Sequence, residues 1–481
     1  MKNKQNNHTY FETCLDCKGE GKKRQKLRKK VRLEHQEKLN KLKPNEEIPV
    51  KPKGHLTLCE TCQGSGLRQS DSFPEPDKEN YPHLAIIGGG IGGTALAVAC
   101  LHRGIPFTLF ERDASFDERK QGYGLTLQQA SRAISGFGLF SLDDGIISTR
   151  HVVHSTEGKI IGEWGLRKWM KTEIKSDPKK TNVHIARQSL RLSLLEQLGE
   201  KNSVKWNHQL VSFSENEEGV DLNFEVNGEL KTVQADLVIG ADGIRSSVRK
   251  NLIGEDNTPL RYLDCIVILG ICKLTKLHDI ESPLLDSATV FQTANGTERM
   301  YMMPYDSESI MWQFSFPFSE KEAKELSSKG ALALKNETLK RTQWHSPIPE
   351  IVEATETSLI SGYPVYDRNL LKPELLNKAN RITLIGDAAH PMSPYKGQGA
   401  NQALLDALIL ARTITRNCRP NSNWKQHEIR ESVLNEFEKE MLERTASKVK
   451  DSAAAAKFLH SPEVLREANE PRGRRLKKEG K

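Results

Sequence analysis

This chain of 481 residues lacks an apolar stretch at its start: the opening MKNKQNNHTYF has no hydrophobic core of the kind found in secretory signal peptides. No other segment combines the length, apolar character and flanking belts of a membrane anchor. We therefore expect neither secretion nor a membrane span, and the expected location is the cytoplasm. Hydrophobic residues make up 37% of the chain, somewhat low but compatible with a globular protein that carries polar tails.

One uncharged run, residues 84–101, comes nearest to a membrane helix, because about 18 apolar residues suffice for a tilted span. Five of the six residues from 88 to 93 are glycine, however. Each glycine inside a helix costs roughly 1 kcal/mol relative to alanine. No aromatic or basic belt flanks the run, so a water-soluble fold is favoured over a span.

The length of 481 residues suggests two or three domains. The formal net charge is +8, and residues 1–80 hold 18 Lys and Arg against 12 Asp and Glu, so most of the excess lies in the first sixth of the chain. The remainder is nearly neutral and gives no argument for nucleic-acid binding. The basic N-terminal part leaves a contact with nucleic acid or an acidic protein open.

Residues 84–111, LAIIGGGIGGTALAVACLHRGIPFTLFE, predict a strand, a glycine turn, a helix, a second strand and an acidic tip. Such a turn brings bare backbone against a pyrophosphate, and the helix directs its free N–H groups at the same phosphate. Glu111 lies where a carboxylate can accept hydrogen bonds from an adenosine ribose. The turn, with GxGxxG spacing, consists of Gly88, Gly90, Ile91, Gly92 and Gly93.

Further along, the sequence alternates between strand and helix patterns. DLNFEVNGELKTV, residues 221–233, predicts a hairpin with an Asn-Gly turn. DLVIGADG at 236–243 and RITLIGDAAH at 381–390 predict two buried strands that each end in glycine. β-branched and aromatic residues alternate between 259 and 370, which indicates an antiparallel sheet, and residues from 399 to about 459 predict helices.

Three of these motifs, in this order, resemble those of a known family, the single-component class A flavin monooxygenases, or aromatic hydroxylases of the para-hydroxybenzoate hydroxylase type. The first is the glycine turn. ADGIRSSVR, residues 241–249, is similar to the family's DG motif, with Asp242, Gly243, Ser246 and Arg249 in place. GDAAHPMSPYKGQGANQALLDA, residues 386–407, is similar to its GD motif, and the resemblance covers roughly residues 84–420.

The resemblance implies a set of FAD contacts. Asp387 would bind the ribityl chain, Pro391 would fix the backbone at the flavin edge, and Arg187 would contact the phosphate or ribose region. A helix N-terminus that faces N1 and O2 of the flavin stabilises negative charge there. Leu405 departs from the acidic residue often found at this position, which weakens any role for a carboxylate there. The remaining residues implied to bind FAD are Arg112, Asp242, Gly397, Gly399, Ala400 and Asn401.

The resemblance also implies the chemistry: NAD(P)H reduces FAD, oxygen adds to give a C4a-hydroperoxyflavin, and one oxygen atom is transferred to a small aromatic or polycyclic substrate. The sequence shows no nucleophile triad or paired acids, and none is needed, since the cofactor carries the reaction. It has no second GxGxxG for the nicotinamide, and NADH and NADPH stay undecided. Halogenation is disfavoured because no WxWxIP occurs.

Residues 14–21, CLDCKGEG, and 59–66, CETCQGSG, repeat the pattern CxxCxGxG. Four thiolates in two such turns suit a tetrahedral zinc ion, with the glycines turning N–H groups toward sulfur. The ligands would be Cys14, Cys17, Cys59 and Cys62. Each unit resembles the repeat of the DnaJ cysteine-rich domain; a redox dithiol pair is the competing interpretation.

The expected fold is α/β: a Rossmann-like FAD-binding domain with an inserted antiparallel-sheet substrate domain, a helical C-terminus and a small N-terminal zinc module. Two alternatives stay open: another FAD-dependent reaction such as epoxidation, oxidation or reduction, or a zinc-dependent interaction protein with a flavin sensor domain. Phe291, Tyr301, Met303, Trp312 and Phe314 are substrate-pocket candidates, with core packing the expected role for most. The parts are the zinc module with its basic insert at 1–70, a linker at 71–83, the FAD-binding domain at 84–258 and 371–460, the substrate domain at 259–370 and a disordered basic tail at 461–481.

Overall fold

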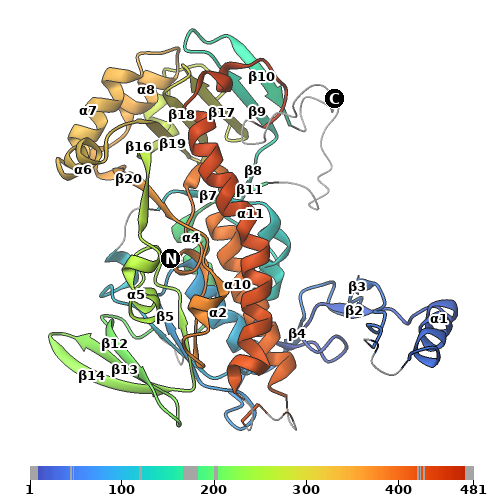
Figure 1. Cartoon of the computed structure of the whole chain (residues 1–481). Helices are drawn as coiled ribbons and strands as arrows, with labels where there is room; N and C mark the ends of the chain where they lie inside the picture. Colours follow the sequence, from blue (N-terminus) through green and yellow to red (C-terminus); the bar gives the residue numbers. More distant parts are fainter. Residues whose placement is uncertain are drawn as a thin grey trace.

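The computed structural model describes residues 9–43, 46, 48–118, 122–165, 182–199, 204–419, 422, 424–425 and 428–471. It confirms the expected α/β architecture. Figure 1 shows one body built on a parallel sheet, a second built on a larger sheet above it, and two long helices, α10 (Gly399–Asn417) and α11 (Asn435–Leu459), beside them. The N-terminal module lies at one side of the lower body.

The lower body is built on a four-stranded parallel sheet of order β21, β15, β5, β6. Of the three motif-bearing strands, β15 therefore lies between β21 and β5 and pairs with both, and parallel strands end at the same edge of their sheet. The sequence-predicted strands are all present. Their bounds are β5 Leu84–Ile87, β6 Phe107–Phe110, β15 Leu237–Gly240 and β21 Ile382–Leu384.

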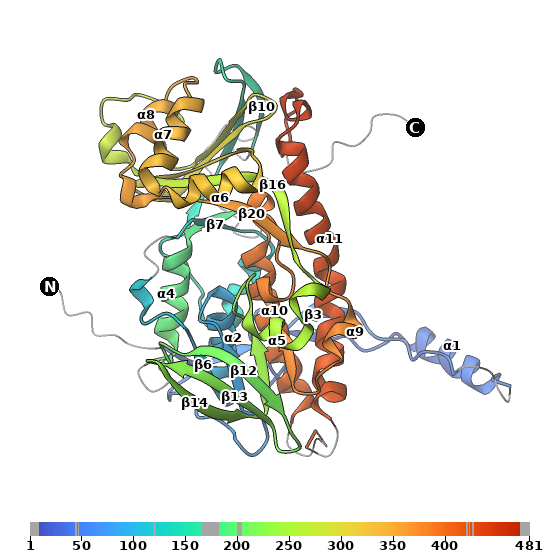
Figure 2. The ribbon, with the colours of Figure 1, turned by 60° about the vertical axis from the view of Figure 1, so that its left-hand side comes forward.

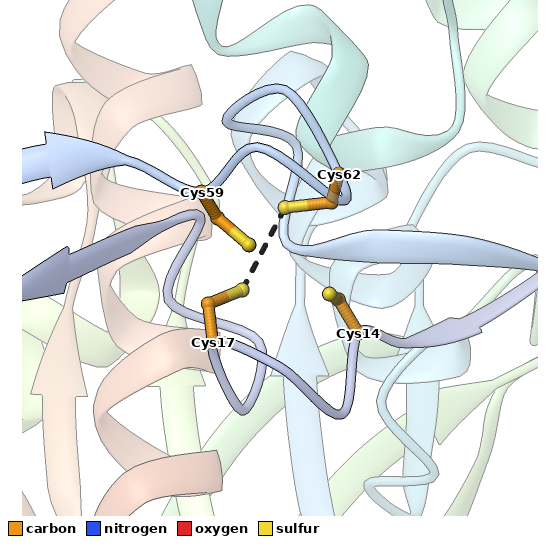
Figure 3. A group of neighbouring side chains, drawn as sticks. All are labelled: Cys14, Cys17, Cys59 and Cys62. Atoms are coloured by element: carbon orange, nitrogen blue, oxygen red, sulfur yellow. Dashed lines mark hydrogen bonds between the residues drawn. The ribbon is translucent and has the colours of Figure 1, made fainter.

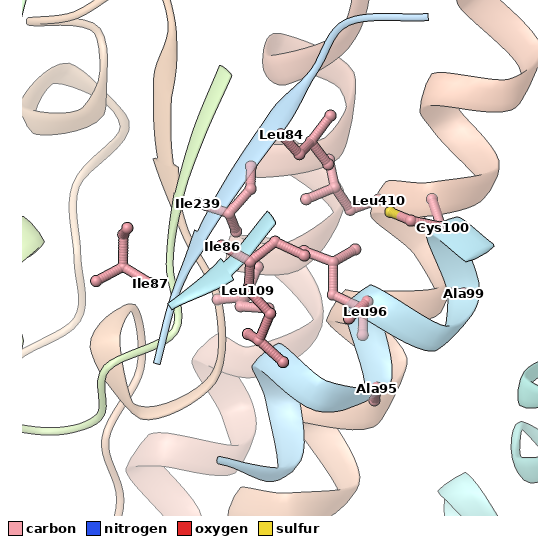
Figure 4. Close-up of a cluster of buried hydrophobic side chains, with 14 of the residues drawn as sticks. Leu84, Ile86, Ile87, Ala95, Leu96, Ala99, Cys100, Leu109, Ile239 and Leu410 are labelled. Atoms are coloured by element: carbon pink, nitrogen blue, oxygen red, sulfur yellow. The ribbon is translucent and has the colours of Figure 1, made fainter. Parts of the chain in front are cut away.

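The uncharged run at 84–101 forms strand β5 and helix α2 (Ile91–Leu101) in the middle of the largest core cluster. Leu96 of the helix and Leu410 of α10 lie against the strands, as Figure 4 shows. Burial on all sides explains why the run carries no charge. Across the described parts of the chain, no helix is long and apolar enough to cross a membrane.

The upper body is a seven-stranded sheet of order β10, β9, β17, β18, β19, β16, β20, in which only the β9–β17 pair is parallel. The sheet recruits β9 and β10 from outside the range 259–370. Helices α6 (Glu320–Ser328), α7 (Ala331–Arg341) and α8 (Ile348–Ala354) cover one face. The strands are β9 Arg150–His154, β10 Ile160–Trp164, β16 Leu260–Lys273, β17 Thr289–Ala294, β18 Arg299–Asp306, β19 Ser309–Pro317 and β20 Ile360–Arg368.

Two small sheets complete the lower body. The predicted Asn-Gly hairpin is present, and both turn residues, Asn227 and Gly228, have positive φ, at 54° and 84°, as a tight hairpin turn requires. The remaining elements are β7 Gly124–Leu127, β8 Ile146–Ile147, β11 Val183–Ala186, β12 Gln209–Glu215, β13 Val220–Val226, β14 Glu229–Ala235, α4 Arg187–Gln197, α5 Ser247–Ile253 and α9 Pro373–Leu376.

The N-terminal module consists of two antiparallel strand pairs, β1 with β4 and β2 with β3, and the helix α1 (Lys29–Asn40). None of the α1 side chains is buried, and the helix stands away from the body in both views (Figures 1 and 2). At the other end of the chain, the Ala468 amide donates to the Ile161 carbonyl on β10, while residues 472–481 of the predicted tail lie outside the described residues. The module strands are β1 Tyr10–Thr13, β2 Lys22–Arg24, β3 Leu56–Leu58 and β4 Leu67–Ser70.

Candidate functional site

A cavity of about 1020 Å³ lies between the carboxyl edge of the parallel sheet and the seven-stranded sheet. Residues from both bodies line it, so it forms only when the two are joined. Loops at the carboxyl edge of a parallel sheet are where α/β folds bind their ligands. The predicted site residues on its wall are Arg112, Asp242, Asp387, Pro391, Gly397, Gly399 and Ala400.

The glycine turn is packed so closely that two of its members have no room for a side chain. A Cβ on Gly88 would lie 2.6 Å from the Ala241 carbonyl oxygen, and one on Gly93 would lie 1.9 Å from the Gly88 carbonyl oxygen. At Gly90, by contrast, the nearest atom is the Arg187 guanidinium, 3.9 Å away. The space in front of Gly90 is thus open and beside a positive charge, as a phosphate site requires.

Glu111 and Arg191 hold the glycine turn in place from two sides. The Glu111 carboxylate accepts a hydrogen bond from the Gly89 amide at 2.7 Å, and the Arg191 Nε donates to the Gly89 carbonyl at 2.7 Å. Both side chains are buried. Sequence reasoning missed Arg191, although it lies one helical turn after Arg187 on the same face of α4.

Asp242 begins the loop after β15. Its Oδ2 accepts hydrogen bonds from the amides of Ser247 and Val248, at 2.7 and 3.2 Å, while Oδ1 has no partner among the described residues. Burial raises the pKa of this carboxyl, and hydrogen bonds to the anion offset part of that effect. Since Asp242 is on the cavity wall, its unpartnered oxygen suits a ligand donor.

Arg249 joins the DG and GD motifs directly. Its Nη1 donates to the carbonyls of Ala388 and Ala389, at 2.7 and 3.0 Å, and its Nε donates to the Thr258 hydroxyl at 3.1 Å. The side chain is almost fully buried. These contacts fix the loop after β15 against the loop after β21, and they explain why two motifs so far apart in sequence belong to one site.

Asp387 lies deep in the molecule but is exposed to the cavity. Burial raises its pKa, and the charges of His390 and Arg187 lower it again in part. Helix α10 begins close by, at Gly399, and its first turn has N–H groups without partners inside the helix. A carboxylate acceptor and a helix N-terminus therefore face the same space.

The Asn401 side chain makes four hydrogen bonds within the protein. Its Oδ1 accepts from the amides of Gln128 and Ala130, at 2.8 and 3.2 Å, and its Nδ2 donates to the carbonyls of Thr126 and Gly397, both at 2.8 Å. The amide is thus fully used in joining the end of β7 to the start of α10. Any contact of Asn401 with a ligand falls to its backbone.

Three of the five pocket candidates, Phe291, Tyr301 and Met303, line the cavity. Trp312 and Phe314 do not; both are fully buried in the core under helices α6 to α8. Strands present successive side chains to opposite faces, so alternate residues of β18 and β19 divide between the cavity and the core. The sequence pattern predicted the strands but not which face met the cavity.

The cavity wall also carries a chain of polar side chains that the sequence did not reveal. Thr126 contacts His184 Nδ1 at 3.0 Å, His184 Nε2 contacts the Ser148 hydroxyl at 2.7 Å, and that hydroxyl contacts His151 Nε2 at 3.3 Å. Burial lowers the pKa of His184 to about 3 and of His151 to about 4. Both rings are therefore neutral near pH 7, and His151 stacks on Trp164 with 5.3 Å between ring centroids.

The four paired cysteines meet in the N-terminal module. Their sulfur atoms lie within 4.8 Å of one another and point toward a common centre (Figure 3). The amides of Gly21 and Gly66 donate to the sulfurs of Cys17 and Cys62, each at 3.2 Å. Gly21 and Gly66 have φ of 70° and 80°, as the CxxCxGxG pattern predicts. The donor set and the N–H contacts fit a tetrahedral metal ion.

Comparison with known proteins agrees with this geometry. The family model described as "FAD binding domain" matches residues 82–425. The chain is 28% identical to an aurachin C monooxygenase/isomerase of Stigmatella aurantiaca over 69% of this chain and 80% of that protein. It is 27% identical to a 3-amino-4-hydroxybenzoate 2-monooxygenase of Streptomyces platensis over 69% and 79%. The crystal structure of Klebsiella pneumoniae HpxO with FAD and uric acid superimposes with a TM-score of 0.66 at 18% identity, over 80% of this chain and 93% of that one.

Proposed function

The chain belongs to the FAD binding domain family and is a flavin monooxygenase, and from this premise we propose that it uses NAD(P)H and oxygen to hydroxylate a small aromatic or polycyclic molecule. The observation that supports this most is the shared cavity, with flavin-motif residues on one wall and aromatic side chains on the other. A relative that acts on an aminohydroxybenzoate and a structural neighbour that binds uric acid both favour a small planar substrate.

The residues present fit FAD. The open space in front of Gly90 suits a pyrophosphate. The unpartnered oxygen of Asp242 and the cavity-facing carboxylate of Asp387 suit the hydroxyl groups of a polyhydroxyl chain. The start of α10 suits the pyrimidine end of the ring, where negative charge develops. When bound, FAD accepts a hydride from the nicotinamide and activates oxygen.

This chain's own residues would position the substrate and exclude water. Phe291, Tyr301 and Met303 offer apolar and aromatic surface to a ring, and His151 and His184 on the same wall are neutral near pH 7. Exclusion of water from the space around the flavin protects a reactive oxygen species from side reactions. The proposal therefore assigns the chain binding and orientation, and no covalent step.

The test is a purified protein with bound FAD, supplied in parallel with NADH and NADPH and a panel of phenols and aromatic acids. We expect faster NAD(P)H oxidation with a true substrate and a product heavier by one oxygen atom that derives from labelled O₂. Nuclear magnetic resonance of the product separates ring hydroxylation from epoxidation. A protein without flavin absorbance that gains none on addition of FAD overturns the proposal.

We also propose that the cysteine cluster holds one structural zinc ion and that the protein works in the cytoplasm. The four converging sulfurs support the zinc site. The eight cysteines, none of which forms a disulfide, support the cytoplasmic location. Elemental analysis should find one zinc per chain, and Cys59→Ser should remove it, whereas Cys272→Ser in the substrate body should not. Equal zinc content in both variants contradicts this site.

A further inference from the structure

Arg299, at the start of β18, is the one charged side chain that the seven-stranded sheet contributes to the cavity wall, as far as the structure describes the chain. The other lining residues from this sheet are aromatic, aliphatic or neutral polar. The side chain is only 5% exposed. A single guanidinium thus stands in the otherwise uncharged wall that the upper sheet contributes.

Within the described ranges of the chain, Arg299 lacks the acidic partner that a buried arginine ordinarily has. Its Nε donates to Gln292 Oε1 at 2.9 Å, and its guanidinium carbon lies 4.8 Å from the centre of the Tyr301 ring. Among the described residues it makes no ion pair, and its other side-chain nitrogens donate to no protein acceptor. The guanidinium therefore keeps donors free toward the cavity.

Among the residues that the structure describes, no carboxylate is close enough to Arg299 to act on its charge. The ionisable groups that act on it are the hydroxyls of Tyr301 and Tyr395, and burial raises the pKa of both, so they stay protonated at neutral pH. Burial also lowers the pKa of the nearby His460 to about 4, so that ring is neutral. Burial lowers the pKa of Arg299 itself to about 10, which leaves it charged near pH 7.

A buried charge without a partner is unfavourable, and an apolar residue of the same size is often more stable at such a position. The cost is recovered when an anion occupies the cavity, because charge-assisted hydrogen bonds to a guanidinium are strong and frequently bidentate. The hydroxyl of Tyr395 lies close enough to Arg299 for the two groups to interact electrostatically, and Tyr395 belongs to the segment directly before α10. An anion held by Arg299 would therefore lie within reach of the flavin end of the cavity.

We propose that Arg299 anchors an anionic oxygen group of the substrate, a carboxylate or an ionised phenol or enol, and so selects aromatic anions over their neutral analogues. The proposal rests on the proposed function for the site, and names the chemical class of its substrate. It also makes Arg299 a residue that sets specificity by direct contact.

The test measures binding rather than turnover. FAD-loaded protein is titrated with benzoate, salicylate and 2-naphthoate, each beside its amide, and with ionised 4-nitrophenol beside 4-nitroanisole. Calorimetry and the change in flavin absorbance report the dissociation constants. We expect at least one anion to bind about 10- to 100-fold more tightly than its neutral partner, the range of a charge-assisted hydrogen bond. The carboxylate and phenol arms tell the two anion sources apart.

In Arg299→Gln the preference for the anion should fall to near unity, and Arg299→Lys should keep part of it. Lys321→Gln removes an equal charge from an exposed position on α6 and should keep it all. Arg299→Met tests folding: its melting temperature should equal or exceed that of the wild type. The inference is overturned if no anion in the panel is preferred, or if Arg299→Gln keeps the preference. Anion preference without any oxygenated product would instead contradict the proposed function alone.

Discussion

The carboxylate of Asp406, on helix α10, accepts three hydrogen bonds, two from the loop after β21 and one from helix α11. The donors are the Gly386 amide at 2.8 Å, His390 Nε2 at 2.6 Å and an Arg444 guanidinium nitrogen at 2.7 Å. The side chain is fully buried. Asp406 thus joins the loop after β21, helix α10 and helix α11. The loop residues that it contacts, Gly386 and His390, lie on either side of Asp387 in the sequence.

Replacement of this carboxylate should lower stability in a pH-dependent way. Burial alone would raise the pKa of Asp406, but the charges and hydrogen bonds of His390 and Arg444 outweigh it, so the pKa lies below its ordinary value. A carboxyl of this kind stabilises the fold above its unfolded pKa of about 4, and that contribution disappears as the pH falls through the lower folded value. Asp406→Asn should cost about 1.5 to 3 kcal/mol at pH 7, since it weakens charge-assisted hydrogen bonds from His390 and Arg444, although Arg444 keeps its ion pair with Glu440.

Urea unfolding of Asp406→Asn and the wild type across pH 3 to 7 checks this expectation. The gap between them should be constant above the unfolded carboxyl pKa of about 4 and shrink toward acid. Glu443→Gln, at an exposed position on α11, is the matched control and should unfold like the wild type at every pH. A variant as stable as the wild type at pH 7 would show that the three hydrogen bonds contribute nothing.

His390, the last residue of the GDAAH sequence, contacts Asp406 through its Nε2. In the sequence, Leu405 weakened any role for a carboxylate at that position, yet Asp406, one position later, accepts hydrogen bonds from Gly386, His390 and Arg444. The signal was present: Asp406 is the sole acid in the apolar stretch GANQALLDALILA. An acid inside a predicted buried helix needs partners, but those partners come from Gly386 and Arg444, whose approach no local pattern specifies.

At the scale of elements, the unit from β5 to α2 contains two glycines with different roles. Gly93 is needed for close packing, whereas Gly90 faces the space proposed for the phosphate. Gly93→Ala should lower the stability of the fold, because its Cβ would lie 1.9 Å from the Gly88 carbonyl oxygen. That oxygen belongs to the backbone and can move only if the chain around it moves. Overpacking of this kind costs about 1 to 3 kcal/mol or more. Gly90→Ala has 3.9 Å of clearance and a φ of −74°, so the protein without FAD should fold normally.

The two variants should therefore differ in what they lose. Melting curves of FAD-free protein should show a lower melting temperature for Gly93→Ala and an unchanged one for Gly90→Ala. Fluorescence titration with FAD should show weaker binding for Gly90→Ala, because its methyl group occupies the side from which a phosphate approaches the backbone. Unchanged FAD affinity in Gly90→Ala would show that the glycine turn does not contact the cofactor.

Elements defined by local chemistry could be predicted from the sequence, and elements defined by distant partners could not. The Asn-Gly hairpin and the three motif strands follow from turn residues and short apolar runs. Strands β9 and β10 join the upper sheet through β17, more than a hundred residues away, so nothing near 150–164 reveals which sheet they enter. The helix α6 lay in a region expected to be a sheet, although Ser319 and Glu322 form a capping box that marks its start.

At the scale of the whole molecule, the N-terminal module packs against the same helix whose other end faces the cavity. Near the end of α10, Arg412 donates to the carbonyls of Gly64 and Ser65, at 3.2 and 3.0 Å, and Arg416 donates to Glu20 at 2.8 Å. Arg412 is half-buried and lies close enough to Cys17 and Cys62 for charge on these cysteines to act on it. The module is therefore docked on the lower body through its two cysteine turns.

This docking predicts that metal loss loosens the module from the body. Four thiolates around a zinc ion carry a net charge of −2, which the guanidinium of Arg412 and the buried Arg103 would balance. Without the metal, the turns lose both their fixed geometry and that charge, so their carbonyls no longer meet Arg412. Chelator-treated protein should be cut faster by a protease within residues 71–83 and should melt at a lower temperature.

Arg412→Gln should show both changes with zinc still bound. The lost charge-assisted hydrogen bonds should lower the free energy that holds the module on the body by about 1.5 to 3 kcal/mol. Lys439→Gln, exposed on α11, should behave like the wild type. If the metal-free protein keeps its resistance to the protease, the module is held by its apolar contact between Phe11 and His102, and zinc serves only the module itself.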